Sequence, residues 1–330
     1  MSPFVEVILT IITASTPLLI AAVGELVAER SGVLNLGVEG MMVMGAVAGF
    51  GGAFLTGSPV VGVLCAIVAG MLMAAIFAFL TLKLVSNQVA TGLALTLLGL
   101  GLSGLIGEHF VGQPGIKLAR LDIPGLSNLP IVGPIVFGED PLVYLSIALT
   151  IAVSYVLFQS RAGLIIRAVG DSHASAHALG VSVVQVRTLS VIFGGACSGL
   201  AGGYLSLAYT PQWIENMTAG RGWIALALVV FASWRPGRVI VGAYLFGSVS
   251  VLGFVVQAVG VTGLLEIVGQ WPGEIQWIVV DAIRVVTTPQ FLSSLPYLVT
   301  VLALVVISKS TRSRGSQAPA CLGQPFVPDR

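Results

Sequence analysis

Apolar residues dominate long stretches of the chain, and these stretches are long enough to form membrane-spanning helices, which need about 20 apolar residues. Charged residues are absent from the runs 7–24, 40–82, 84–107, 141–160, 188–214, 239–265 and 285–308. The run 40–82 counts as two spans, because Gly57, Ser58 and Pro59 mark a turn inside it. With a shorter run at 222–234, the pattern predicts an all-α, polytopic integral membrane protein with about 8–10 transmembrane helices.

Composition supports this assignment. Of 330 residues, 56% are hydrophobic and only 9% are charged, whereas a soluble domain carries about 25% charged residues. A soluble enzyme, a disordered protein and a basic nucleic-acid binder are therefore excluded. The three cysteines are too few and too far apart for a disulfide framework or a zinc site. The N-terminus lacks a basic segment before its apolar run, so no cleavable signal peptide is expected.

The distribution of basic residues predicts the orientation, because Lys and Arg accumulate in short cytoplasmic loops. If the spans alternate, one side receives Lys83, Arg161, Arg167, Arg187, Arg235, Arg238, Lys309, Arg312 and Arg314. The loop 161–187 is then cytoplasmic, and 109–140 and the N-terminus are external. We expect a transmembrane domain over 1–308 and a disordered cytoplasmic tail over 309–330. Four charged residues interrupt 262–290, which we interpret as a loop with an interfacial helix.

Glycine and polar residues interrupt two of the apolar segments, at 24–40 and at 215–223. In the predicted topology these segments run in opposite directions, so they occupy corresponding places in two inverted-repeat halves. Broken helices expose backbone groups, which are tolerated in a bilayer where they line a cavity. We therefore infer a substrate path near both breaks, whose polar candidates are Asn35, Glu39, Asn87, Gln88, Thr91, Thr218 and Arg221. The alternative is that the glycines serve helix packing and that Glu39 and Arg221 are interfacial.

The cytoplasmic loop contains two predicted short helices, over 161–168 and 174–179, on either side of Gly170, Asp171 and Ser172. Asp171 or Ser172 is suited to cap the second helix, and Gly180 to end it. Such a compact helix suits insertion into a groove of another protein, although an ordinary amphipathic connector has the same pattern. His173 and His177 have a metal-compatible spacing but no third ligand nearby, so no metal site is expected.

No motif for catalysis is found in the sequence. There is no Gly-x-x-x-x-Gly-Lys-Ser/Thr loop for ATP, no His-Glu-x-x-His motif and no evident Ser/His/Asp set. We therefore expect a protein without enzymatic activity of its own.

Five blocks of the sequence resemble the permease subunits of bacterial ABC importers, within the group that includes nucleoside, ribose and branched-chain amino-acid permeases. The blocks are 29–42 (ERSGVLNLGVEGMM), 87–95 (NQVATGLAL), 167–181 (RAVGDSHASAHALGV), 217–227 (MTAGRGWIALA) and 295–300 (LPYLVT). They are most similar to the nucleoside permeases. The sequence departs from the usual pattern at Ser172, where Asn is common, and at Ala174, where an acidic residue is common.

The resemblance implies a multi-pass permease of the bacterial inner (plasma) membrane that works with several partners. These are two cytoplasmic ATP-binding subunits, a second homologous permease subunit and an extracytoplasmic substrate-binding lipoprotein or protein. No cofactor is expected in the chain, because ATP binds to the partner subunit. The loop 161–187 would be the coupling loop, with Gly170, Asp171, Ser172, Ala176 and Gly180 in contact with the ATPase.

The sequence leaves several functions open. The first is import of nucleosides or related small polar solutes, and the second is import of a simple sugar such as ribose. An ion-coupled secondary transporter would need a carboxylate deep in the membrane, for which Glu39 is the one fair candidate. A membrane enzyme or a scaffold is disfavoured by the lack of a catalytic motif.

Overall fold

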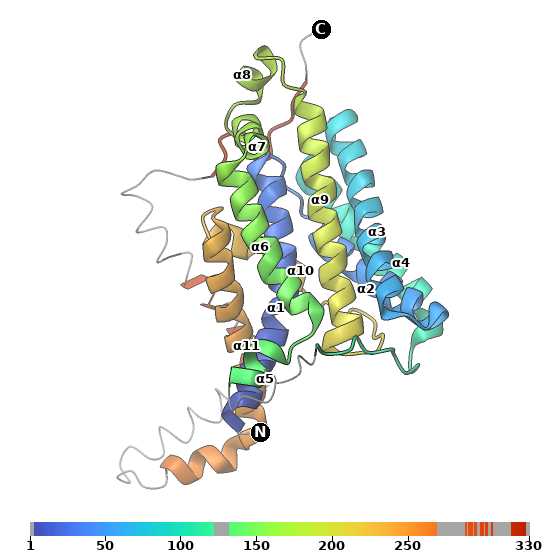
Figure 1. The fold of residues 1–330 in the computed structure, drawn as a ribbon, viewed down its shortest axis with the longest axis vertical. Helices are drawn as coiled ribbons and strands as arrows, with labels where there is room; N and C mark the ends of the chain where they lie inside the picture. Colours follow the sequence, from blue (N-terminus) through green and yellow to red (C-terminus); the bar gives the residue numbers. More distant parts are fainter. Residues whose placement is uncertain are drawn as a thin grey trace.

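The computed structural model describes residues 3–121, 132–268 and 318–327, together with separate positions between 288 and 305. The described elements are helices (Figure 1). The longer ones are α1 (Pro3–Arg30), α2 (Val38–Thr56), α3 (Pro59–Ala78), α4 (Gln88–Gly107), α6 (Pro141–Gln159), α9 (Val183–Tyr204) and α11 (Pro236–Val268). The shorter ones are α5 (Val132–Phe137), α7 (Arg161–Asp171), α8 (His173–Ala178) and α10 (Arg221–Phe231). Single π-helical turns, Phe79–Lys83 and Leu205–Tyr209, extend α3 and α9, and a 3-10 turn, Glu108–Phe110, follows α4.

Seven helices in the described part of the chain are long and apolar enough to cross a membrane. They confirm the prediction of a polytopic all-α membrane protein. The run 222–234 corresponds to α10, whose 11 residues reach only about 16 Å. Helix α11 continues to Val268, into the stretch 262–290 that we interpret as a loop with an interfacial helix. Residues 269–287 and most of the last predicted span, 285–308, lie outside the described residues.

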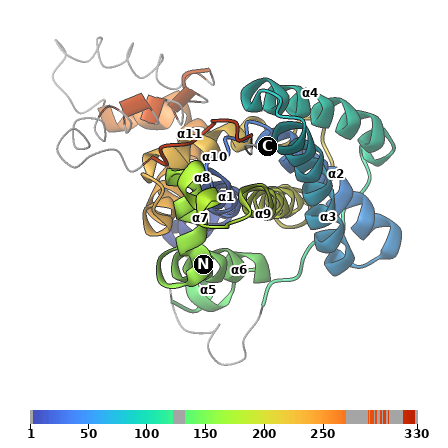
Figure 2. The same cartoon turned by 90° about the horizontal axis from the view of Figure 1, so that it is seen from above.

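Helices α1 and α9 lie at the centre of the bundle (Figure 2). Helices α2, α3 and α4 lie on one side of this pair, α10 and α11 on another, and α6 on a third. Most residues of α1, α2 and α9 are buried, whereas α3, α4 and α6 expose most of their apolar side chains at the periphery. This burial pattern fits a membrane protein, because lipid accepts apolar side chains on the outer face.

Glycines allow α9 to approach α2 and α3 at backbone contact. A Cβ on Gly199 would overlap the carbonyl oxygen of Ala66, and a Cβ on Gly45 would overlap backbone atoms of Gly199. Gly195 and Gly70 are related in the same way. Small residues at such crossings are the usual means by which membrane helices pack closely. These glycines, which lie outside the two breaks, therefore serve helix packing.

The two ends of the bundle carry different elements (Figure 1). Helix α5 lies at the end where the chain begins, and α7 and α8 lie at the opposite end. The described parts of 109–140, residues 109–121 and 132–140, thus lie at the opposite end from the loop 161–187, as the charge distribution predicted. Which end faces the cytoplasm stays a prediction.

The C-terminal residues modify the expectation of a disordered tail over 309–330. Residues 318–327 turn back onto the α7–α8 end of the bundle, where the amide of Cys321 donates to the carbonyl of Gly170 at 2.9 Å. The amide of Gly323 donates to the carbonyl of Gly32 at 3.1 Å. For this stretch, backbone hydrogen bonds replace the expected disorder, whereas 309–317 lie outside the described residues.

Candidate substrate path and coupling loop

The first break separates α1 from α2 at residues 31–37, and polar side chains satisfy its backbone. The side-chain oxygen of Asn35 accepts from the amide of Gly37 at 2.9 Å, in a local turn that ends just before α2. Gln88, at the start of α4, accepts from the amide of Leu34 through Oε1 at 2.8 Å. Both Asn35 and Gln88 are buried. These bonds explain how an irregular segment persists inside an apolar bundle.

The second break lies between the π-helical end of α9 and the start of α10. Its backbone adopts left-handed conformations at Asn216, Ala219 and Gly220, with φ values of 55°, 46° and 82°. Such values are costly for a residue with a side chain and require support from neighbouring groups. The result is a short turn that directs several N–H groups toward one point.

Glu39 occupies that point and connects the two breaks. Its Oε1 accepts from the hydroxyl of Thr218 at 2.5 Å and from the amide of Gly220 at 2.8 Å. Its Oε2 accepts from the amide of Gly222 at 2.6 Å. The carboxylate comes from the first turn of α2 and sits at the N-terminus of α10, where the helix dipole favours negative charge.

Arg221 follows this turn, but its guanidinium is directed elsewhere. It donates to the carbonyl oxygens of Met217 and Thr218 at 3.0 and 3.2 Å and lies 5.6 Å from the ring centre of Tyr209. Glu39 and Arg221 are therefore directed at backbone groups, the Thr218 hydroxyl and an aromatic ring.

The structure brings together only some of the predicted path residues. Glu39, Thr218 and the turn before Arg221 form one cluster, and Asn35 and Gln88 form a second around the first break. Asn87 is exposed and caps α4, accepting from the amide of Ala90 at 3.0 Å. Thr91 bonds to Ser86 at 2.9 Å. Asn87 and Thr91 thus have local roles at the start of α4.

Two carboxylates that the sequence analysis did not select lie beside the first break. Glu25 and Glu29 are fully buried on one face of α1. Oε1 of Glu25 accepts from the amide of Asn35 at 3.3 Å, and Oε2 of Glu29 accepts from the indole of Trp234 at 2.5 Å. The signal was their spacing of four residues, which puts both on the same helix face. The charge-free run 7–24 ends just before both residues, so it does not include them.

The predicted coupling loop forms two helices with a break at Ser172. The Ser172 hydroxyl accepts from the amide of Ser175 at 3.3 Å, which caps α8. Gly180 ends α8 with a φ of 82°, and its amide donates to the carbonyl of His177 at 2.8 Å. The capping residues predicted from the sequence thus have the expected geometry.

Two of the predicted coupling residues face inward. Ala176 is 4% exposed and packs with Val169 and Val183, and Gly170 lies against the carbonyl of Arg30. In the chain as described, these two residues are not on the docking surface that we assigned to them. Asp171, Ala178 and Gly180 are exposed, and Leu179 is 84% exposed. The small residues of α8 gave no periodicity from which to distinguish its two faces.

Ionisable groups lie outside the spans at both ends of the bundle. At the α7–α8 end, burial lowers the pKa of His173, and the neighbouring Arg187 lowers it further. Nη2 of Arg187 lies 3.3 Å from Nδ1 of His173, and because a guanidinium only donates, Nδ1 accepts. At the opposite end, burial and the neighbouring Asp140 raise the pKa of Glu139 to about 7. Asp140 caps α6 through the amides of Leu142 and Val143.

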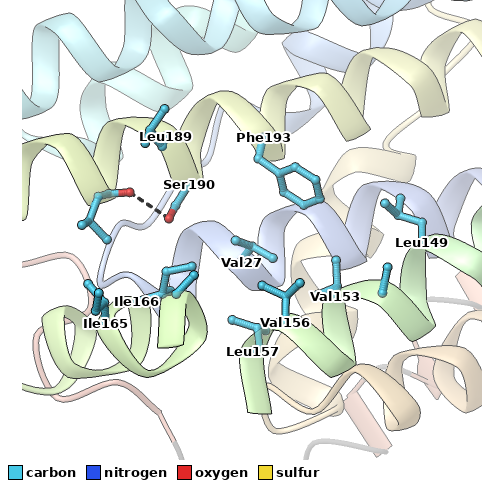
Figure 3. Close-up of a pocket in the computed structure, with 13 residues that line it drawn as sticks. Val27, Leu149, Val153, Val156, Leu157, Ile165, Ile166, Leu189, Ser190 and Phe193 are labelled. Atoms are coloured by element: carbon cyan, nitrogen blue, oxygen red, sulfur yellow. Dashed lines mark hydrogen bonds between the residues drawn. The ribbon is translucent and has the colours of Figure 1, made fainter. Parts of the chain in front are cut away.

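An apolar pocket of about 420 Å³ lies between α1, α6, α7 and α9 (Figure 3). Val27, Val153, Ile166 and Phe193 are among the side chains that line it, and Ser190 bonds to the carbonyl of its own helix at 2.9 Å. A sugar or nucleoside needs hydrogen-bonding partners that this lining does not offer. The pocket is therefore unsuited to a polar solute.

Comparison with known proteins decides the family. The family described as "Branched-chain amino acid transport system / permease component" matches residues 7–288. The chain belongs to this permease family. It is thus a multi-pass inner-membrane protein, and its relatives are subunits of ABC transporters. No solved structure gives a significant match.

Several relatives of this permease have names that specify a solute. A putative glucose ABC transporter permease of Haloferax volcanii, TsgC13, is 40% identical and covers 96% of this chain and 95% of its own. The nucleoside ABC transporter permease NupC of Lactococcus lactis is 29% identical, with 88% and 89% covered. The guanosine ABC transporter permease NupQ of Bacillus subtilis is 32% identical, with 74% and 83% covered.

Proposed function

We propose that this permease translocates a small, neutral, hydroxyl-rich solute as the membrane subunit of an ABC importer. The observation that carries the proposal is the contact of Glu39 with Thr218, Gly220 and Gly222, which joins the two breaks. Donors of the protein itself satisfy the carboxylate of Glu39, so this charge is not available to a solute. The polar side chains at the first break, Asn35 and Gln88, are uncharged amides, which suit a neutral polar solute.

Gln88 is the residue that we assign to direct solute contact. Its Oε1 is bound to the amide of Leu34, whereas its buried Nε2 has no hydrogen-bond partner among the described residues. A buried donor without a partner is costly, and a hydroxyl or ring acceptor of a passing solute would satisfy it. A single hydrogen bond of this kind is weak, which favours release of the solute.

Nucleosides are the first candidate class, since the sequence blocks resemble nucleoside permeases and two relatives carry nucleoside or guanosine in their names. A simple sugar is the second candidate, because the relative at 40% identity is named as a putative glucose permease. An ion-coupled transporter is disfavoured, because the chain belongs to a permease family whose relatives are named as subunits of ABC transporters.

The partners of this permease follow from its family and are part of the proposal. One ATP-binding subunit would dock on the outer face of α8, and a second would dock on the coupling loop of a second permease that completes the path. An external binding protein would deliver solute. ATP hydrolysis would then take place on the partner subunits. Rigid-body movement between two packed states would alternate access to the path.

The test is uptake into proteoliposomes that contain the complete transporter and its binding protein. We expect ATP-dependent uptake of either a labelled nucleoside or labelled glucose, and competition with the unlabelled compounds identifies the class. Gln88→Met should lower this uptake roughly 2- to 12-fold, the effect of one hydrogen bond. Gln113→Met, at an exposed loop position, is the matched control. Uptake of neither solute, or of charged solutes alone, would contradict the proposal.

ATPase docking is tested separately on α8. Ala178→Trp places bulk on the exposed face and should abolish transport while the permease folds normally. Ala176→Trp places the same bulk in the cluster with Val169 and Val183 and should reduce the yield of folded protein. Normal transport by Ala178→Trp would mean that this face of α8 does not dock the ATPase.

A further inference from the structure

The C-terminal segment 318–327 joins two parts of the permease that are far apart in sequence. Through Cys321 and Gly323 it forms backbone hydrogen bonds to Gly170, at the end of α7, and to Gly32, in the first break. Two turns shape the segment: the amide of Leu322 donates to Pro319 at 3.1 Å, and that of Gln324 to Cys321 at 3.1 Å. The segment therefore lies between the coupling loop and the predicted path.

Arg187 of α9 is the buried hub of this junction, with 1% of its surface exposed. Its Nε donates to the carbonyl of Ser31 at 3.2 Å, and its Nη1 donates to the carbonyl of Gln324 at 3.0 Å. Its Nη2 lies 3.3 Å from His173 of α8. One planar guanidinium thus holds the first break, the C-terminal segment and α8 in fixed relative positions.

Phe326 packs the same segment against α8. Its ring lies between the imidazoles of His173 and His177, with ring centres 5.2 and 5.4 Å apart in edge-to-face geometry. It also borders the cluster of Val169, Ala176 and Val183. A six-residue helix is not stable in isolation, so these contacts fix the position of α8. They leave its outer face, with Ala178 and Leu179, exposed.

We propose that residues 318–327 act as a clamp that makes α8 and the first break move as one body. Arg187 and Phe326 are its positioning residues, and the inference rests on the proposed coupling function of α8. Force applied to α8 would pass through Phe326, Arg187 and Gln324 to Ser31 and Gly32. Asn35, in the same break, and Gln88, bound to Leu34, lie next along this chain of contacts.

The test measures both transport and ATP hydrolysis in the complete reconstituted transporter. Phe326→Ala, and a chain that ends at Gln317, should assemble and continue to hydrolyse ATP. The amount of solute moved per ATP should fall about 5-fold, within the range seen when contacts in a coupled network are removed. Phe326→Leu retains an apolar side chain and should therefore keep the amount of solute moved per ATP between the values of Phe326→Ala and the wild type. Val327→Ala, at a position 65% exposed in the same segment, is the matched control and should leave it unchanged.

The outcomes separate the clamp from the proposed function. If the wild-type complex shows no ATP-dependent uptake, the proposed function fails. If the wild type transports but Phe326→Ala and the truncation keep the normal ratio of solute to ATP, the clamp is overturned. A lower yield of complex with a normal ratio also overturns it, because the segment would then serve stability alone.

Discussion

Single residues hold this permease together at the places where its helices are interrupted. Glu39 accepts three hydrogen bonds from the turn before α10, and Arg187 donates to three different parts of the chain's α7–α8 end. Each satisfies backbone groups that lipid cannot satisfy. Replacing either therefore affects structure before it affects solute selection.

Glu39→Gln should destabilise the folded permease by about 3 kcal/mol. Both carboxylate oxygens accept from donors, so the side-chain NH2 of Gln would face an N–H or O–H donor in either orientation. Thermal unfolding in detergent and the yield of monodisperse protein measure the effect. Glu215→Gln, exposed in the same loop, should behave as the wild type. Equal stability of the two variants would show that the Glu39 contacts do not hold the breaks together.

The raised pKa of Glu139, about 7 against an ordinary 4.5, predicts a pH dependence of stability. Burial favours the protonated carboxyl in the folded state, so the folded state binds more protons between pH 4.5 and 7. Stability should therefore fall as the pH rises through this window. Glu139→Gln should remove this part of the dependence in melting curves recorded from pH 5 to 8. A slope unchanged by the substitution would assign the dependence to other groups.

Whole elements depend on close approach of helix backbones. Helix α9 contacts α2 and α3 through glycines, and α10 is a short helix that begins directly after the turns at 215–220. The bundle thus contains two kinds of region: the closely packed helices α2, α3 and α9, and the two breaks beside them. Mutations should act differently in each.

Gly199→Val should reduce the amount of folded permease, since side-chain atoms at this position overlap the backbones of Ala66 and Gly70. Overpacking of this kind costs about 1–3 kcal/mol or more. Gly101→Val is the matched control, because a Cβ on Gly101 of α4 meets nothing within 4 Å. The readout is the fraction of protein that elutes as a single species after extraction. Similar yields for both variants would argue against the close α9 contacts.

The sequence predicted elements better than it predicted their partners. Charge-free runs located the spans, and Gly with Asn or Glu located both breaks, because these are local properties. The contact of Glu39 with Thr218 joins residues 179 positions apart, which no local pattern encodes. Glu25 and Glu29 fall outside the charge-free run 7–24, and their partners, the amide of Asn35 and the indole of Trp234, are known only from the fold. The C-terminal segment binds mainly through its backbone, which leaves no compositional signal.

At the scale of the whole molecule, the bundle has two distinct ends, with α5 and the exposed loop after α4 at one and α7 and α8 at the other (Figure 1). The basic residues predict that the α7–α8 end faces the cytoplasm. This orientation is what allows an ATPase to reach α8 and a binding protein to reach the opposite end. ATPase docking and delivery of the solute by the binding protein both depend on this orientation.

Labelling of single cysteines tests this orientation. In a background without Cys65, Cys197 and Cys321, a cysteine at Gln113 should react with a membrane-impermeant reagent in intact cells. A cysteine at Ser175, exposed on α8, should react only after the membrane is opened. The reverse pattern would place α8 outside the cell, where no ATPase could bind it.

The bond between Glu39 and Thr218 also has a consequence for biosynthesis. The ribosome makes Glu39 179 residues before Thr218, and at about 5–20 residues per second the interval is roughly 9–36 seconds. A charged side chain at the centre of a bilayer costs about 2.5–3.5 kcal/mol on insertion scales. Nascent chains that end before α10 should therefore remain attached to the insertion machinery, and chains that extend past Trp234 should leave it. Synthesis of the second break would thus allow the segment with Glu39 to leave the insertion machinery as part of the folded bundle.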